Sequence, residues 1–257
     1  MATGRTLKRW TRLYVDGVDL SGYTREIGPL VWTYPEVDIV ALTDGVRGAL
    51  VDMPEISPGV LNGIFDNTAT SGIHAALGSA GVCRDVMIPV GIRAEPAEGD
   101  PVFMGAFNHN GYVAQPSGGD IVLTCEFGKT SPAEAMTYEK PWGVLLHEKS
   151  AETAANEAAG VDDRGASSSL GGWMMYQIFA VAGEGTVTIT TEEASTNSNA
   201  NFALLTDATS GEIAHTAVPC AGIVKLGTTA AVKRYLRWQI ALDGITSCTF
   251  ALSFVRA

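Results

Sequence analysis

Hydrophobic and polar residues alternate over the last stretch of the chain, residues 233–256, which reads KRYLRWQIALDGITSCTFALSFVR. The apolar residues that share one parity are Leu236, Trp238, Ile240, Leu242, Cys248, Phe250, Leu252 and Phe254. This period of two is typical of strands that are buried on one face. Asp243-Gly244 interrupts the pattern and predicts a tight turn, because Gly tolerates positive φ. The stretch is therefore predicted to be a hairpin whose apolar face needs a second sheet to cover it.

The first half of the chain contains further short apolar runs separated by Gly, Pro and Asp. The predicted strands are 13–15, 27–34, 56–65, 86–92, 102–107 and 121–127. Pro58-Gly59 predicts a bulge or an edge within one of them. Residues 71–77 predict one short helix, with capping residues at 66–68 before it and Gly78 after it. This order of elements favours a β-sandwich or barrel with one helix packed against it.

The second half predicts a separate sandwich. Strands are expected at 173–182 and 186–191, on either side of Gly183-Glu184-Gly185, and then at 202–205, 212–217 and 222–226 before the final hairpin. Residues 148–172 lack an apolar stripe and predict a long loop. Pro141-Trp142-Gly143 marks the boundary, so two domains are predicted at 1–140, with a flexible basic arm at its start, and 141–257. The predicted fold class is mainly all-β.

Residues 36–52, EVDIVALTDGVRGALVD, form an apolar stretch with a turn signal at Thr43-Asp44-Gly45. One interpretation is an extended, partly hairpin excursion that leaves the body of the domain. The other is that its apolar residues fold back onto the core. The pattern favours neither interpretation over the other.

Composition narrows the class of protein. The chain has 257 residues, 46% hydrophobic and 18% charged, with a formal net charge of -11. Such an acidic chain is a poor candidate for binding the phosphate backbone of a nucleic acid, because affinity for these phosphates comes from Lys and Arg. Cys83, Cys125, Cys220 and Cys248 form no CxxC pair and are predicted to be free thiols, as in a reducing cytosol. No signal peptide or membrane span is predicted.

Candidate chemistry is sparse. His74, His109, His147 and His215 have no His, Cys or carboxylate at ligand spacing, so packing or surface roles are predicted. Asp162-Asp163 lacks the ligand spacing of an EF-hand calcium loop. Ser167-Ser168-Ser169 lacks the Gly-x-Ser-x-Gly sequence that surrounds a hydrolase nucleophile. Trp142 and Trp173 are candidates for stacking on sugar rings. We predict that the protein is not an enzyme and uses no cofactor or metal.

Several segments carry a resemblance to a known family. They are 13–27 (LYVDGVDLSGYTREI), 37–50 (VDIVALTDGVRGAL), 56–66 (ISPGVLNGIFD), the helix at 73–77, and 101–107 with 119–127. Together they cover about residues 13–130, and they resemble the major tail tube proteins of long-tailed, siphovirus-type bacteriophages. The second half resembles, more loosely, the accessory β-sandwiches that phages append to tail or capsid proteins, and it would be displayed on the outside of the assembly.

The resemblance implies a structural virion protein without enzymatic activity. Its copies would form stacked, six-membered rings, joined edge to edge, that make a tail tube through which DNA passes without tight binding. It also implies tape-measure and tail-terminator or tail-tip proteins as partners, no membrane contact, and synthesis in the host cytoplasm before incorporation into the tail. The implied inter-ring contact loop contains Val37, Asp38, Ile39, Leu42, Asp44, Val46, Arg47 and Leu50. A capsid decoration or head–tail connecting protein, and a cell-surface glycan-binding module, are the alternatives.

Overall fold

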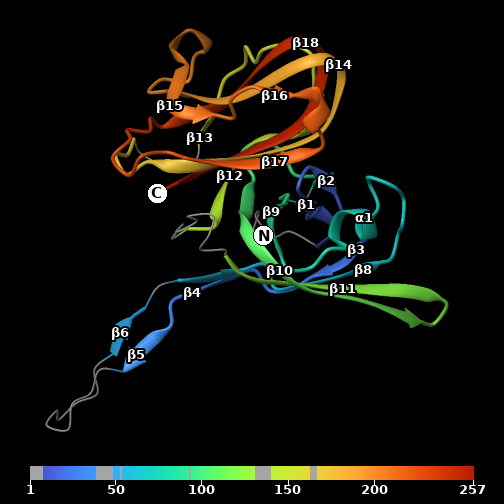
Figure 1. Cartoon of the computed structure of the whole chain (residues 1–257). Helices are drawn as coiled ribbons and strands as arrows, with labels where there is room; N and C mark the ends of the chain where they lie inside the picture. Colours follow the sequence, from blue (N-terminus) through green and yellow to red (C-terminus); the bar gives the residue numbers. More distant parts are fainter. Residues whose placement is uncertain (1–7, 39–48, 53, 93, 131–139, 163–166) are drawn as a thin grey trace, which may run out of the picture.

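The computed structural model describes residues 8–38, 49–52, 54–92, 94–130, 140–162 and 167–257 (Figure 1). The described chain is mainly β-strand, which confirms the predicted fold class. The short helix that the sequence predicts is α1, which spans Ile73–Leu77 and buries Ile73 and Leu77. Gly78 follows it and donates its N–H to the His74 carbonyl.

The strands are short in the first third of the chain and several are long afterwards. In chain order they are β1 (Tyr14–Val15), β2 (Val18–Asp19), β3 (Thr24–Ile27), β4 (Val31–Thr33), β5 (Glu36–Asp38), β6 (Ala49–Val51), β7 (Glu55–Ser57), β8 (Val60–Ile64), β9 (Val82–Pro89), β10 (Pro101–Ser117), β11 (Asp120–Thr130), β12 (Trp142–Glu152), β13 (Val161–Asp162), β14 (Gly172–Ala194), β15 (Ala203–Thr209), β16 (Ile213–Ala214), β17 (Cys220–Lys225) and β18 (Tyr235–Arg256). Short 3-10 helices lie at Lys8–Trp10, Asn199–Asn201 and His215–Ala217.

Fourteen of these strands belong to one antiparallel sheet, with the central order β15-β14-β18-β12-β10-β11-β8-β3. The sheet crosses the predicted domain boundary, because Val102 of β10 pairs with Gly143 of β12. The boundary at 140/141 stays a prediction, but the two halves share hydrogen-bonded strands. Strands β4 and β7, and strands β5 and β6, form two separate two-stranded sheets.

The predicted C-terminal hairpin is wrong. β18 is one strand of 22 residues, and it pairs along its length with β14, a strand of 23 residues. The two expected turns lie opposite each other in the β14–β18 pair. The register of the pair shifts around Gly183, and Gly244 has a φ of +72°. A positive-φ glycine serves a bulge as well as a turn, and here it lets both long strands bend and continue.

The connection between the predicted strands 102–107 and 121–127 is shorter than their bounds imply, and so is the loop predicted at 148–172. β10 and β11 continue outwards until Ser117 pairs with Asp120, so only Gly118 and Gly119 form the turn, with φ of +62° and +107°. The result is a long two-stranded hairpin that projects from the body (Figure 1). The loop predicted from residue 148 begins later, because β12 runs on to Glu152, where it pairs with Cys248 of β18.

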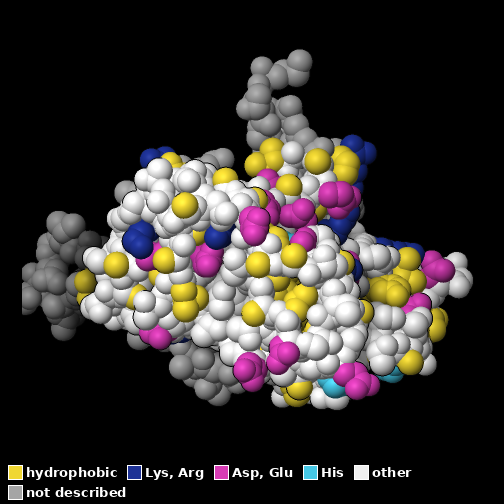
Figure 2. All heavy atoms as spheres, turned by 90° about the horizontal axis from the view of Figure 1, so that it is seen from above, with side chains coloured by type: hydrophobic (Ala, Val, Ile, Leu, Met, Phe, Trp, Pro, Cys, Tyr) yellow, Lys and Arg dark blue, Asp and Glu magenta, His cyan; other side chains and the backbone are white. Residues whose placement is uncertain are grey.

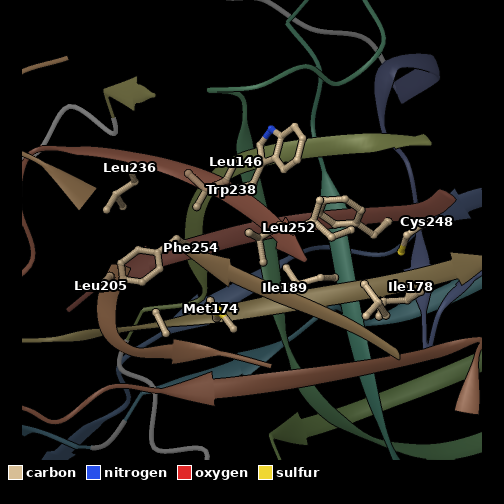
Figure 3. Close-up of a cluster of buried hydrophobic side chains, with 14 of the residues drawn as sticks. Leu146, Met174, Ile178, Ile189, Leu205, Leu236, Trp238, Cys248, Leu252 and Phe254 are labelled. Carbon is tan, nitrogen blue, oxygen red and sulfur yellow. The ribbon is translucent and has the colours of Figure 1, made fainter. Parts of the chain in front are cut away.

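The alternation of β18 does predict its burial correctly. Its even-numbered apolar residues line the main core of the second half, with Trp238, Leu252 and Phe254 among them (Figure 3). Near its end, the odd-numbered residues Ala251 and Val255 are buried as well, in a second cluster on the other face. The strand is thus covered on both sides there.

That second cluster lies between the two halves. It joins Tyr14, Met87, Val102, Met104 and Ala106 of the first half to Leu145, Trp173, Met175, Ala251 and Val255 of the second. A third cluster fills the first half and includes Ile73 and Leu77 of α1 together with Phe103 and Phe107. The halves therefore share buried apolar surface in addition to strands.

The turn between β1 and β2 also fixes the halves together. The Gly17 N–H donates to Gln177 Oε1 at 2.6 Å, and Gln177 Nε2 donates to the Asp85 carbonyl at 3.0 Å. Gly17 has a φ of +79°, and a Cβ there would lie 2.5 Å from the Ile178 oxygen and from the Cys220 nitrogen. Only a glycine allows this backbone to approach β14 and β17 so closely.

Candidate functional site

A two-stranded arm extends from the body of the protein (Figure 1). It continues the β3–β8 pair outwards, first as β4 paired with β7 and then as β5 paired with β6. Among the described strands, β4 to β7 pair only with one another and not with the main sheet. The described part of the arm therefore forms its own ladder and leaves the body, as the excursion interpretation expects.

The base of the arm is anchored to the body. Ile56 of β7 is only 3% exposed and belongs to the core of the first half. The neighbouring Ser57 Oγ donates to the Phe127 carbonyl at 2.9 Å. These contacts fix the direction in which the arm leaves the body.

The arm carries large apolar side chains in solvent. They are Trp32, Tyr34, Val37, Leu50 and Val51. Val37 and Leu50 are directly paired across β5 and β6, and they are 48% and 60% exposed. Directly opposed residues lie on the same face of a two-stranded sheet, so these two side chains form one apolar spot. Clustered exposed apolar groups of this kind mark a surface that another molecule covers.

The structure describes only part of the predicted contact loop. Val37, Asp38 and Leu50 lie on the arm. The remaining predicted residues lie outside the described residues: Ile39, Leu42, Asp44, Val46 and Arg47. The role of the whole set in contacts between rings stays a prediction.

A solvent-facing sheet surface adjoins the arm, and the sequence analysis missed it. The cross-strand row that faces the core consists of Ile27, Leu61, Cys125 and Tyr112. The neighbouring row, on the opposite face, consists of Glu26, Asn62, Thr124 and Val113. Leu61 and Cys125 are buried, whereas Glu26 and Val113 are exposed. We call this opposite face, on β3, β8, β11 and β10, the outer face. The alternation of residues 121–127 indicated such a face, but the sequence could not show which strands lie beside it.

The arm and the β10–β11 hairpin leave this four-stranded region at opposite ends. Val60, next to the arm, pairs with Glu126, while Ile64 pairs with Val122, nearer the hairpin turn. Because β8 and β11 are antiparallel, the arm extends from one end of the pair and the hairpin from the other. Figure 1 shows the two projections pointing away from each other.

The histidines occupy packing positions, in line with the sequence analysis. His109 and His147 are buried, and His74 and His215 are partly buried. His147 stacks on Phe250, with ring centroids 4.1 Å apart. This stacking places the His147 imidazole inside the fold.

His147 has polar neighbours, but their arrangement differs from a hydrolase triad. Its Nδ1 lies 3.1 Å from the Phe250 carbonyl oxygen. Ser150 Oγ and Glu152 Oε1 both lie near Nε2, at 3.2 and 3.1 Å. A triad needs the hydroxyl and the carboxylate on different ring nitrogens, so that the carboxylate orients the ring while the other nitrogen takes the proton. This cluster does not provide that arrangement.

The burial of two histidines makes the stability of the fold depend on pH. Desolvation lowers the pKa of His109 and of His147 in the folded protein. The unfolded chain, with a histidine pKa of about 6.5, therefore binds more protons as the pH falls towards and below that value. The stabilising contribution is complete above about pH 6.5 and is lost as the pH falls, by up to about 1.4 kcal/mol per pH unit for each histidine.

We expect the double variant H109N/H147N to flatten this dependence between pH 7.5 and 5.5. Asparagine keeps a donor for the backbone carbonyls that the Nδ1 atoms contact, at Ser79 and Phe250. Burial raises the pKa of Glu98, which acts in the opposite direction, but its effect cancels when variant and parent are compared. Urea unfolding at each pH measures the slope. A double variant that loses stability as steeply as the parent would contradict the assignment.

The two candidate tryptophans differ in exposure. Trp173 is 2% exposed and belongs to the cluster between the halves, so its ring offers no face to a sugar. Trp142 is 36% exposed and lies edge-on to Phe103, with ring centroids 5.4 Å apart. The glycan contact therefore remains a prediction for Trp142 alone.

None of the four cysteines forms a disulfide bond in the structure. Cys125 and Cys248 are buried, and burial raises the pKa of each thiol to about 12. Burial also raises the pKa of the Cys220 thiol, to about 11. Thiols with such pKa values carry little thiolate and react slowly at neutral pH.

Within the described ranges, no group of three or more His, Cys, Asp or Glu side chains is placed to hold a metal ion. Asp163 of the predicted acidic pair lies outside those ranges. No helix in the described part of the chain has both the length and the hydropathy to cross a membrane. Figure 2 shows acidic side chains scattered over one face of the molecule, among hydrophobic and uncharged ones.

Comparisons with known proteins find only distant similarity. No family model matches the sequence, and no curated protein matches it. A solved structure that resembles the chain is the Dit protein (gp 19.1) of phage SPP1, described as a paradigm of the hub adsorption apparatus in phages that infect Gram-positive bacteria. The two are 14% identical, the match covers 95% of this chain and 99% of that one, and the TM-score is 0.33. At this identity and TM-score, the likeness does not establish a function for this chain.

Proposed function

We propose that the protein is a structural subunit of a phage tail, and that its copies assemble into stacked rings that form the tail tube. The observation that carries this proposal is the apolar arm that leaves the body between β3 and β8. A monomer leaves these side chains in water, whereas a neighbouring copy can cover them.

The free energy gained by burying arm side chains favours repeated contacts between copies. Covering one large apolar side chain contributes about 1.5–3 kcal/mol, and association costs about 4–15 kcal/mol in lost freedom. Several arm residues must therefore be buried together before assembly is favourable. A closed ring meets this need, because every subunit both gives and receives a contact.

The charge of the chain suits a conduit for DNA. A formal net charge of -11 repels a polyanion, so DNA can pass along the lumen without being held. On this proposal the second half of the chain lies on the outside of the tube. Tape-measure, tail-terminator and tail-tip proteins would be its other partners in the virion.

Electron microscopy of the concentrated protein at increasing salt tests the proposal. We expect hollow tubes or stacked rings, more of them as salt rises, because salt screens the repulsion between acidic subunits. Sedimentation velocity on the same samples measures the fraction assembled. Particles that remain monomeric or trimeric at every salt concentration would overturn the tube and favour a decoration protein.

A further inference from the structure

Two strands of the four-stranded region beside the arm have an open edge. Among the described strands, β3 pairs with β8 alone. β9 covers the other side of β10 only as far as His109. Beyond that residue, and within the described ranges, β10 pairs with β11 alone, up to Ser117. Open edges expose backbone N–H and C=O groups that can pair with another chain.

The directions of these two edges are complementary. β10, β11, β8 and β3 are successively antiparallel, so β3 runs opposite to β10. A second copy placed beside the first in the same orientation would bring its β10 antiparallel to β3 of the first. This contact uses different surfaces on the two copies, and such head-to-tail contacts generate rings when the rotation closes.

The burial of alternate residues restricts the register. Glu26 lies on the outer face, together with Val113 and therefore Gln115. Ala114 has the opposite parity and points with Tyr112 towards the core side. A sheet that continues across the contact must keep its two faces, so Glu26 can lie opposite Val113 or Gln115 but not Ala114.

We infer that β3 of one copy pairs with the outer part of β10, residues 110–117, of the next copy. The partner is a second copy of this chain, and the contact is a backbone ladder with the parity given above. This inference rests on the proposed self-assembly and specifies its lateral contact.

Cysteine cross-linking of the full chain tests the pairing. Within one chain, Glu26 and Gln115 lie three strand spacings apart, at least about 14 Å, whereas the Cα atoms of a disulfide lie within about 7 Å. A disulfide between these positions must therefore join two copies. We expect oxidised E26C/Q115C or E26C/V113C to give a ladder of covalent oligomers on a non-reducing gel, with the ring as its last band.

Three controls accompany the experiment. The oxidised parent measures the background from the native cysteines. E26C/A114C has the wrong parity and should give no ladder above that background. E26C alone should give no dimer, because a dimer would mean that two β3 edges meet.

The outcomes separate this inference from the proposed function. A ladder with the expected parity supports the edge pairing. Rings or tubes under the microscope without a ladder from either expected pair overturn the pairing and leave the tail-tube proposal standing. A ladder from E26C/A114C, or a dimer from E26C alone, also overturns the pairing. If neither rings nor ladder form, both proposals fall.

Discussion

Replacing Val37 with Lys and Leu50 with Glu is expected to stop assembly while leaving the subunit folded. The two residues are paired across β5 and β6, so the change converts an apolar spot into a pair of opposite charges. The new pair still stabilises the two-stranded sheet, and the net charge is unchanged. A neighbouring copy would have to desolvate both charges, which costs more than the apolar contact contributed.

Sedimentation velocity and electron microscopy measure this loss under conditions where the parent assembles. Leu204→Lys is the matched control, because Leu204 is 53% exposed but lies on β15, in the second half of the chain. The control should assemble like the parent. Normal tubes from V37K/L50E would remove the arm from the assembly contact.

Gly17→Ala is expected to destabilise the protein far more than Gly81→Ala. The two glycines have similar φ values, +79° and +83°, so alanine meets the same backbone strain at both, about 1 kcal/mol. A Cβ at Gly81 meets nothing within 4 Å, whereas at Gly17 it meets backbone atoms of Ile178 and Cys220 at 2.5 Å. Relieving that overlap moves β14 and β17 away from the turn, for a total of about 3 kcal/mol.

Urea unfolding of both variants measures the difference, which reports how tightly the two halves pack. Equal losses of stability would mean that the Gly17 turn does not depend on β14 and β17. A second transition in G17A alone would show that the halves unfold separately once this contact is weakened.

Local patterns in the sequence predict the class of fold and much of the core. The alternation around Trp238 and Phe250 identifies buried faces because a strand's side chains alternate regardless of its partner. The pattern fails at Gly183 and Gly244, where it predicts turns. A type I′ or II′ hairpin turn and a G1 bulge both place a glycine at positive φ, and only the partner strand decides between them.

The sequence could likewise predict one part of the candidate site and not another. The arm could be anticipated as one of two interpretations, because its apolar residues, such as Leu50, have turn and proline signals around them and no partner nearby in the sequence. The outer face and the open edges could not be anticipated from the sequence. They depend on the register that brings Glu26, Asn62 and Thr124 into one row, which joins segments about 100 residues apart.

The bond between Gly17 and Gln177 has a consequence for synthesis on the ribosome. The two residues are separated by 160 positions in the chain. At about 5–20 residues per second, the turn waits roughly 8–30 seconds for its partner to be made. During that interval the arm already exists, while Tyr14 and Met87 still lack the residues of the second half that cover them. If copies assemble as proposed, a nascent chain meets other copies before its own fold is complete, and chaperone binding to that uncovered surface would delay such encounters until translation ends.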